Sequence, residues 1–504
     1  MSRQKNSINN LKWGILGNII TSVVAIIIPR LFIVNYGSEV NGLLSSIRQI
    51  YVYLALLEAG VGDASVVALY GPIGRNDHKT VNKILAATHY YYKKIGIAYA
   101  ACVLALGGIY PLLLDTTISY GTCFWVIVLQ GSGSVISYFV QGKYNMLLRV
   151  DNKSYITTNL ATVTSVMTDL IRIVLLLNGK SIIEVQATYL VFNLAKMLYV
   201  SWYIKKNYSW IDLSVTPDFK SISQKSAVMV HQISSLVFSH TDVLILTFVC
   251  GLKTVSIYSM YATIYGMVDN VINIISNSVQ AALGQIFHTD RKKFLKLQEA
   301  FETYYLAIVF SLLTIAFIFA LPFMKLYTRG ADINYVDYRL PILFTMYQLL
   351  SYGRASSNNI LSFAGAFKET QWRAVLEATI NLVVSFICVF KFGIYGVLFG
   401  TVVALIYRAN DIILFANRRV LKRSAWATYR RWITDFFVLI VIIICFEKLQ
   451  LRIETYTKLL VAGIWVSIVV VSIFIVVASV IEKQARETAI YYIRQMILKK
   501  EEGY

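Results

Sequence analysis

Charged side chains inside long apolar runs are the residues of this sequence best suited to chemistry. A charge in hydrocarbon costs several kcal/mol, so such residues face a helix-bundle interior or a wet cavity. Guanidinium groups bind phosphate oxygens in pairs, which suits them to a diphosphate. We therefore expect an anionic substrate to contact the following intramembrane cations: Arg30, Arg48, Lys196, Arg354 and Arg408.

Arg354 has the most informative surroundings of the five. It stands in the stretch SYGRASSNN, where small and hydroxyl-bearing residues favour close helix packing beside a polar lumen. Two of the other cations have competing structural interpretations. Arg408 could pair with Asp411 along one helix face, and Arg30 could extend to the lipid headgroups.

Acidic and histidine side chains inside the spans are candidates for coupling transport to an ion gradient. A buried carboxyl group or imidazole can take up a proton, and a carboxylate can bind a cation. Asp169 is set apart, since Arg172 follows three residues later and could pair with it. The candidates for H+ or Na+ coupling are Glu58, His240, Asp242 and Asp269.

No pattern indicates an enzyme or a metal site. His231 and His240 lack metal-ligand spacing and a third ligand, and the five cysteines form no CxxC pair. The sequence contains no nucleotide-binding P-loop, no HExxH and no nucleophile elbow. We expect no catalytic residue, no metal and no cofactor beyond a coupling ion, which indicates a transporter.

The elements that must position these residues are membrane spans. Of 504 residues, 57% are hydrophobic and 15% are charged, whereas soluble domains have about 25% charged residues. The mean hydropathy is +0.61. Because about 20 apolar residues cross a bilayer as a helix, we predict an all-α polytopic membrane protein. Its fourteen spans are predicted at residues 11–34, 40–62, 86–113, 121–147, 155–178, 182–204, 228–250, 254–284, 301–327, 338–363, 370–391, 393–416, 431–448 and 456–481.

The distribution of basic residues predicts the orientation of these spans. With the N-terminus placed in the cytoplasm, most Lys and Arg fall in inside segments, as the positive-inside rule requires. The same rule explains the net charge of +20, so nucleic acid is not expected as a partner. Both termini are predicted to lie on the cytoplasmic side.

An internal repeat divides the chain into two lobes. Shifted by 213 residues, ALYGPIGRNDHK aligns with ALGQIFHTDRKK and places Asp77 on Asp290; upstream, GSEVNGLLS aligns with GLKTVSIYS. Each copy contains six spans, so the lobes insert with the same orientation, related by a pseudo-two-fold axis along the membrane normal. We predict an N-lobe at 1–204, a cytoplasmic linker at 205–227, a C-lobe at 228–416, and two further spans with a cytoplasmic tail at 417–504.

The first hundred residues resemble the opening of bacterial polysaccharide repeat-unit flippases of the O-antigen and capsule type. The likeness rests on PRLFIVNYGSEVNGLLSSI, LEAGVGDASVVALYGPIGRNDHKTVNKI and YYYKKIG. These flippases belong to the multidrug/oligosaccharidyl-lipid/polysaccharide (MOP) exporter superfamily. The resemblance implies two lobes that alternate access to a central cavity in the bacterial cytoplasmic (inner) membrane. The two extra C-terminal spans resemble those of fourteen-span members, whose last pair can bound a lipid groove.

The implied activity is translocation of undecaprenyl-diphosphate-linked oligosaccharide units for surface polysaccharide biosynthesis. The implied partners are this lipid-linked substrate, membrane lipid, and polysaccharide polymerase or assembly proteins. Arg30 and Arg48 stand where the resemblance places the first-lobe cavity charges. A peptidoglycan-precursor flippase is an alternative, since the headgroup chemistry is shared. A MATE-like drug antiporter would carry a carboxylate in the first span, where Arg30 stands instead, and a polysaccharide polymerase would need larger outer loops.

Overall fold

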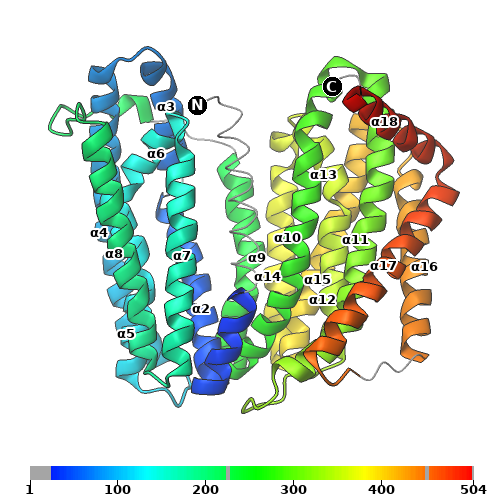
Figure 1. Ribbon diagram of the computed structural model, residues 1–504, viewed down its shortest axis with the longest axis horizontal. Helices are drawn as coiled ribbons and strands as arrows, with labels where there is room; N and C mark the ends of the chain where they lie inside the picture. The colour runs from blue at the N-terminus through cyan, green and yellow to red at the C-terminus, as the bar shows by residue number, and fades with distance from the viewer. Residues whose placement is uncertain (1–23, 59, 223–227, 449–452, 502–504) are drawn as a thin grey trace. The chain divides into compact units, whose positions relative to one another are not determined.

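The computed structural model describes residues 24–58, 60–222, 228–448 and 453–501, and every regular element in these ranges is helical (Figure 1). After the helix Val24–Tyr36, the first half of the chain forms α2 (Ser38–Leu54), α3 (Val61–Gly74), α4 (His78–Leu113), α5 (Tyr120–Ile136), α6 (Gly142–Val150), α7 (Ser154–Leu177) and α8 (Ile182–Asn207). The second half forms α9 (Val228–Cys250), α10 (Leu252–Thr289), α11 (Arg291–Tyr327), α12 (Arg339–Gly353), α13 (Ala355–Phe363), α14 (Phe367–Phe392), α15 (Ile394–Phe415), α16 (Trp426–Lys448), α17 (Tyr456–Ile481) and α18 (Lys483–Glu501).

The predicted all-α polytopic membrane fold is confirmed. Within the described ranges, nine helices are long and apolar enough to cross a bilayer. Each of the fourteen predicted spans coincides with helical chain, although the start of the first, before Val24, lies outside the described residues. Many large apolar side chains on these helices are exposed, as expected of surfaces that face lipid.

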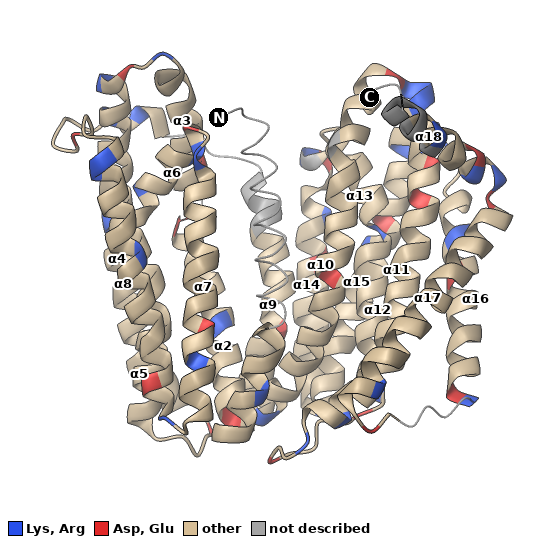
Figure 2. Ribbon diagram, in the orientation of Figure 1, with Lys and Arg blue, Asp and Glu red and all other residues tan. Residues whose placement is uncertain are grey.

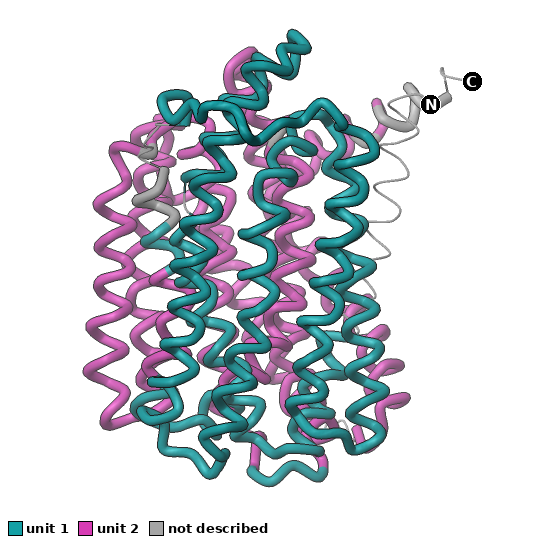
Figure 3. The backbone as a smooth tube through the Cα atoms, turned by 90° about the vertical axis from the view of Figure 1, so that its left-hand side faces the viewer, with its two compact units in different colours: residues 1–236, 246–256, 330–333 teal, residues 237–245, 257–329, 334–504 magenta. Residues whose placement is uncertain are grey.

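The chain packs as two compact units, coloured separately in Figure 3. Unit 1 comprises residues 1–236, 246–256 and 330–333, and unit 2 comprises residues 237–245, 257–329 and 334–504. The predicted division into lobes at 204 and 228 stays a prediction, because part of the linker lies outside the described residues.

The two copies of the repeat share backbone features at the aligned positions. Asp77 caps α4 by accepting a hydrogen bond from the Thr80 backbone N–H, and Asp290 caps α11 in the same way from Lys293. Gly37 and Gly251, aligned by the upstream match, precede α2 and α10 with φ values of 83° and 81°. A positive φ strongly favours glycine. Equivalent helices of the two copies therefore begin with the same kind of residue, an aspartate cap or a glycine with a positive φ.

Three elements depart from the predicted spans. The span at 40–62 ends in a 3-10 turn at Ala55–Glu58 and a left-handed Gly60, after which α3 begins. The span at 338–363 breaks at Arg354 into α12 and α13. The predicted cytoplasmic tail forms the helix α18. In the spans at 40–62 and 338–363, a few polar or glycine residues interrupt the apolar pattern. These interruptions are too short for the hydropathy of the sequence to show that each span consists of two helices.

Candidate functional site

A cluster of two arginines and one carboxylate lies on α2 and α7 of unit 1; Figure 2 shows the basic and acidic residues along the helices of the described chain. Arg172 Nη1 lies 3.4 Å from Asp169 Oδ1, which confirms the predicted pair, and donates a hydrogen bond of 2.9 Å to the Tyr189 hydroxyl. Its guanidinium also stacks over the rings of Phe32 and Tyr189. Arg48 on α2 is exposed and close enough to interact electrostatically with Asp169. Arg172 pairs with this carboxylate and Arg48 adds a second positive charge within electrostatic range of it, so the cluster keeps a positive charge.

The remaining candidates of unit 1 occupy separate helices. Arg30 lies half-buried on the helix Val24–Tyr36. Lys196 is half-buried on α8, and no hydrogen bond or ion pair joins its amino group to another described residue. Glu58 ends the 3-10 turn after α2 and accepts a hydrogen bond from the Tyr92 hydroxyl. Sharing of one site by Arg30, Arg48 and Lys196 stays a prediction.

Unit 2 holds a larger arginine cluster, which brings Arg354 and Arg408 together on one acid. Glu377 on α14 lies 2.7 Å from Arg354 Nη1 and 3.3 Å from Arg408 Nε, although neither contact is aligned as a hydrogen bond. Arg408 also makes the predicted bond to Asp411, at 2.7 Å, and Asp411 binds Arg373 as well. Three arginines face two carboxylates, so this cluster also keeps a positive charge.

Asp242 on α9 lies among oxygen atoms of α14 and α15. It is 4% exposed; Thr401 Oγ1 donates to its Oδ2 at 2.8 Å, and its Oδ1 has no hydrogen-bond partner among the described residues. Thr401 Oγ1 is also 3.3 Å from Asn381 Oδ1, which accepts a bond of 2.9 Å from Ser385 Oγ. Both hydroxyls also lie within hydrogen-bond distance of the Val397 carbonyl, at 3.0 and 3.3 Å.

Three hydroxyl groups reach the oxygen cluster around Asp242. Tyr258 and Thr401 donate to Asp242 Oδ2, at 3.3 and 2.8 Å, and Ser385 lies within hydrogen-bond distance of the Asn381 amide oxygen and the Val397 carbonyl. Asp242 Oδ1 receives no hydrogen bond from the described residues, so it is the atom at which a proton or a cation would bind. The close approach of α14 and α15 depends on glycine at position 400, because a Cβ there would lie 2.3 Å from Ser385 Oγ.

The other two coupling candidates of unit 2 have sparser surroundings. Asp269 on α10 accepts a hydrogen bond of 3.0 Å from Gln348, and its Oδ1 is buried without a partner in the described part of the chain. His240, two residues before Asp242, is half-buried. Among the described residues, no cluster of three His, Cys, Asp or Glu side chains could hold a metal ion.

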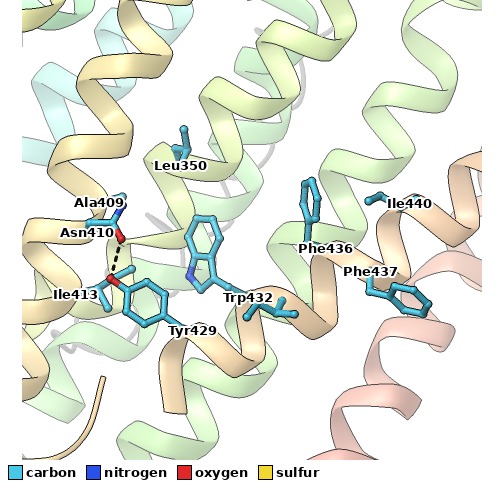
Figure 4. A pocket seen from close by; sticks show the side chains of 10 residues that line it. Leu350, Ala409, Asn410, Ile413, Tyr429, Trp432, Phe436, Phe437 and Ile440 are labelled. Atoms are coloured by element: carbon cyan, nitrogen blue, oxygen red, sulfur yellow. Dashed lines mark hydrogen bonds between the residues drawn. The ribbon is translucent and has the colours of Figure 1, made fainter. Parts of the chain in front are cut away.

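An apolar groove lies beside the arginine cluster of unit 2. It has a volume of about 420 Å³ and is lined from α12, α15 and α16, with Leu350, Ile413, Trp432 and Phe436 among its walls (Figure 4). Leu350 is one helical turn before Arg354, on the same helix face. The Tyr429 hydroxyl donates a hydrogen bond of 2.7 Å to Asn410 at one end of the groove.

A second buried ion-pair cluster joins the C-terminal helices to the rest of unit 2. Glu302 on α11 lies 2.9 Å from Arg431 Nη1 and 2.6 Å from Arg423 Nη2, and Arg431 also pairs with Glu482 at 3.2 Å. Burial raises the pKa of Glu482, but hydrogen bonds from Arg430 and Arg431 and their charges outweigh it and hold this pKa below its ordinary value. Basic residues expected only to mark the inner face are thus structural.

Sequence reasoning missed several residues of these sites. Glu377 was not singled out as the shared partner of two arginines, and nothing distinguished Asn381, Ser385 and Thr401 from other polar residues of apolar helices. Their spacing carries a signal in retrospect. Asn381 and Ser385 stand four apart on α14, and Val397 and Thr401 stand four apart on α15, so each pair shares a helix face.

Comparisons with known proteins identify the fold. No family model and no curated protein matches the chain. Among solved structures, the lipid II flippase MurJ in an inward closed conformation matches 93% of this chain and 99% of its own, with a TM-score of 0.67 and 15% identity. An inward-facing MATE-family multidrug resistance transporter of the MOP superfamily matches 80% and 95%, with a TM-score of 0.61 and 14% identity.

A third neighbour extends the same pattern. The MATE multidrug transporter DinF-BH, solved as a complex, has a TM-score of 0.51 and 13% identity over 81% of this chain and 94% of its own. All three neighbours are membrane transporters. At these identities the likeness concerns architecture alone, and the chain has the fold of these solved transporters.

Proposed function

We propose that this protein is a flippase for undecaprenyl-diphosphate-linked oligosaccharide, working by alternating access in the cytoplasmic membrane with both termini in the cytoplasm. The observation that carries the proposal is the surplus of arginine over carboxylate part-way along the helices of both units. In unit 1 Asp169 pairs with Arg172 and lies within electrostatic range of Arg48, and in unit 2 three arginines pair with Glu377 and Asp411. A lasting positive charge at membrane depth suits an anionic headgroup.

The substrate's two chemical parts match two kinds of surface. Guanidinium groups bind diphosphate oxygens in a bidentate manner, and Arg48 and Lys196 are the least neutralised of the candidate cations outside the helix Val24–Tyr36. The apolar groove beside Leu350 and Trp432 offers a surface for part of the polyprenyl chain. The likeness to a lipid II flippase supports a lipid-linked substrate. The sugar is the open part of the proposal, and a peptidoglycan precursor remains the alternative.

The energy source is proposed to be a cation gradient acting through Asp242. Its carboxylate and the neutral oxygens of Asn381, Ser385, Val397 and Thr401 form a set suited to one monovalent cation or one proton. One carboxylate among neutral ligands balances a single charge. Binding at this site would change the electrostatics between α9, α14 and α15, the three helices that contribute to it.

The test uses purified protein in liposomes that carry a fluorescent undecaprenyl-diphosphate oligosaccharide in one leaflet. Its appearance in the other leaflet is followed with a Na+ gradient, a pH gradient or none, and lipid II serves as the competing substrate. We expect protein-dependent transfer that is faster with one gradient, and an Asp242→Asn variant that has lost this acceleration. Absence of transfer, with efflux of a cationic dye from the same vesicles, would favour an antiporter instead.

The matched control is Asp269→Asn, which removes a carboxylate that also lies inside unit 2 but has fewer oxygen neighbours. This variant should keep the gradient dependence. Equal loss in both variants would contradict a specific role for Asp242.

A further inference from the structure

Asp435 lies on the buried face of α16 without a hydrogen-bonding partner in the described part of the chain. The buried residues of this helix share one face, as their spacing of three and four shows: Thr428, Arg431, Asp435, Leu439 and Ile442. Asp435 is 3% exposed, and no described residue forms a hydrogen bond or an ion pair with its carboxyl group. Burial of a carboxylate without a partner is costly, so these surroundings favour the protonated acid.

Two charged groups act on Asp435, and both belong to the ion-pair cluster at the start of α16. Arg431 stands one turn earlier on the same helix, and Glu482 is the C-cap of α17, which packs against α16. Beyond this cluster the facing helices are uncharged, since α11 carries no charged residue over 303–324 and α17 carries none over 459–481. Asp435 therefore faces apolar chain from α11 and α17.

The other helices that meet α16 hold their charges in a separate cluster. The helices α12 and α15 reach α16 at the apolar groove. Their charged side chains at this depth, Arg354, Arg408 and Asp411, pair within the arginine cluster of unit 2. Arg431 is therefore the cation best placed to balance Asp435.

Arg431 is already engaged with other carboxylates. Its Nη1 donates to Glu302 at 2.9 Å, and its Nη2 donates to Glu299 at 2.9 Å and to Glu482 at 3.2 Å. Its Nε is buried and has no acceptor among the described residues. The guanidinium thus serves three acids and leaves Asp435 without a donor, although only one helical turn separates the two residues.

The charges of the ion-pair cluster balance while Asp435 is neutral. Three guanidinium groups pair there with three carboxylates: Arg423, Arg430 and Arg431 with Glu299, Glu302 and Glu482. An ionised Asp435 would add a fourth negative charge inside the contact between α11, α16 and α17. A proton bound to Asp435 removes that charge.

We propose that Asp435 is a proton-binding site, distinct from Asp242, and that its proton holds α16 against α11 and α17. Loss of the proton places an unbalanced charge on the buried face of α16 and weakens this packing. The groove in Figure 4 responds to the same change, because Trp432 and Phe436 in its wall lie within one turn of Asp435 on α16. The inference does not depend on which substrate the protein transports.

Infrared spectroscopy of the purified protein at pH 7 tests for the proton directly. A protonated carboxyl group has a carbonyl stretching band that a carboxylate lacks. The difference spectrum between the unchanged protein and Asp435→Asn should contain this band, with the intensity of one carboxyl group. A difference spectrum without the band would mean that Asp435 is ionised and would overturn the proposal.

The matched control is Asp63→Asn, which removes an exposed carboxylate paired with Arg149. Its difference spectrum should lack the band, and a band of equal size in both variants would overturn the assignment to Asp435. Should Asp435→Asn fail to yield folded protein by size-exclusion chromatography, Asp435→Ser takes its place, because it also removes the carboxyl group. The same two outcomes then decide the proposal.

Hydrogen exchange measured by mass spectrometry tests what the proton does to α16. Exchange is compared at pH 6 and pH 9 after correction for the intrinsic rates, with α7 as the internal reference. In the unchanged protein, α16 should exchange at least several-fold faster at pH 9 relative to α7, whereas Asp435→Asn should show no such increase. Equal relative protection of α16 at both pH values, or the same increase in Asp435→Asn, would overturn the role of the proton in holding α16.

Discussion

Arg48 in unit 1 and Arg408 in unit 2 are both arginines inside apolar helices. Their surroundings differ, so Arg408 is suited to a structural role and Arg48 to binding a ligand. Arg408 has a side chain only 5% exposed, with Glu377 and Asp411 both in contact. Arg48 is exposed and lies within electrostatic range of a single carboxylate, Asp169, which is already paired with Arg172. Each cluster keeps a positive charge. In unit 1 the exposed member is Arg48, whereas in unit 2 Arg408 is buried and the most exposed of the three arginines is Arg373, which is paired with Asp411.

The comparison teaches that a charge inside a membrane span is a weak indicator of a binding site until its partners are known. Two carboxylates beside one buried guanidinium balance its charge and leave little of it accessible to a ligand. Such a group holds helices together, here α14 and α15. An arginine that shares one acid retains donors for a ligand, so Arg48 is a better candidate for substrate contact than Arg408, and Arg354 is intermediate.

The largest expected effect comes from removing the acid that Arg354 and Arg408 share. Glu377→Ala leaves the buried guanidinium of Arg408 and the partly buried one of Arg354 short of a partner, which should cost about 3–5 kcal/mol of stability. The measurement is thermal unfolding in detergent, followed by fluorescence-detected size exclusion. A melting temperature equal to that of the unchanged protein would mean that the cluster is solvated and that the contrast with Arg48 is false.

The next largest effect is expected from Arg48→Ala, which should affect transport more than stability, in contrast to Glu377→Ala. Arg48→Ala should slow transfer of the lipid-linked oligosaccharide about tenfold or more, since a hydrogen bond to a charged group contributes about 1.5–3 kcal/mol. Its stability should change by less than about 0.5 kcal/mol, as for most exposed positions. The measurement pairs the liposome assay with the unfolding assay.

Arg354→Ala is the matched variant for Arg48→Ala. The sequence-based prediction is that it abolishes transfer at normal membrane abundance and that Arg354→Lys restores part of it. Loss of abundance in both Arg354 variants would instead assign this residue to the structural cluster. Normal transfer by Arg354→Ala would remove it from the substrate site.

The smallest effect concerns a carboxylate that lies outside both arginine clusters. Hydrogen bonds from the side chain and backbone of Thr80 hold the pKa of Asp77 below its ordinary value. Its stabilisation is therefore present above the unfolded pKa of about 3.9 and is lost as the pH falls through the lower folded value. Asp77→Ala should reduce stability slightly at pH 7 and less at pH 3. Equal losses at both pH values would mean that the cap acts without its charge.

The sequence was sufficient to predict the helices, because each span is a long apolar run whose backbone can satisfy its hydrogen bonds only within itself. The sequence was insufficient to predict where helices break inside a span. Gly60 and Arg354 each break a helix within an apolar stretch, and hydropathy averaged over a span hides a single residue. The helix α18 was missed because it is too polar to be read as a span.

The candidate residues were predictable one by one, but their partners were not. The i,i+3 pairs Asp169–Arg172 and Arg408–Asp411 could be read from spacing, and both exist. The contact of Glu377 with Arg354 and Arg408 depends on how three helices pack, and no local pattern encodes it. The same holds for the oxygens around Asp242.

The ion pairs of Glu302 have a consequence for how the chain is made. Its partners Arg423 and Arg431 follow 121 and 129 residues later. At a synthesis rate of about 5–20 residues per second, α11 waits about 6–26 s for the guanidinium groups that pair with its buried carboxylate. During biogenesis Glu302 is expected to stay at the aqueous surface until these partners are present. The last helices to emerge from the ribosome therefore decide when the middle of the protein can settle into the bilayer.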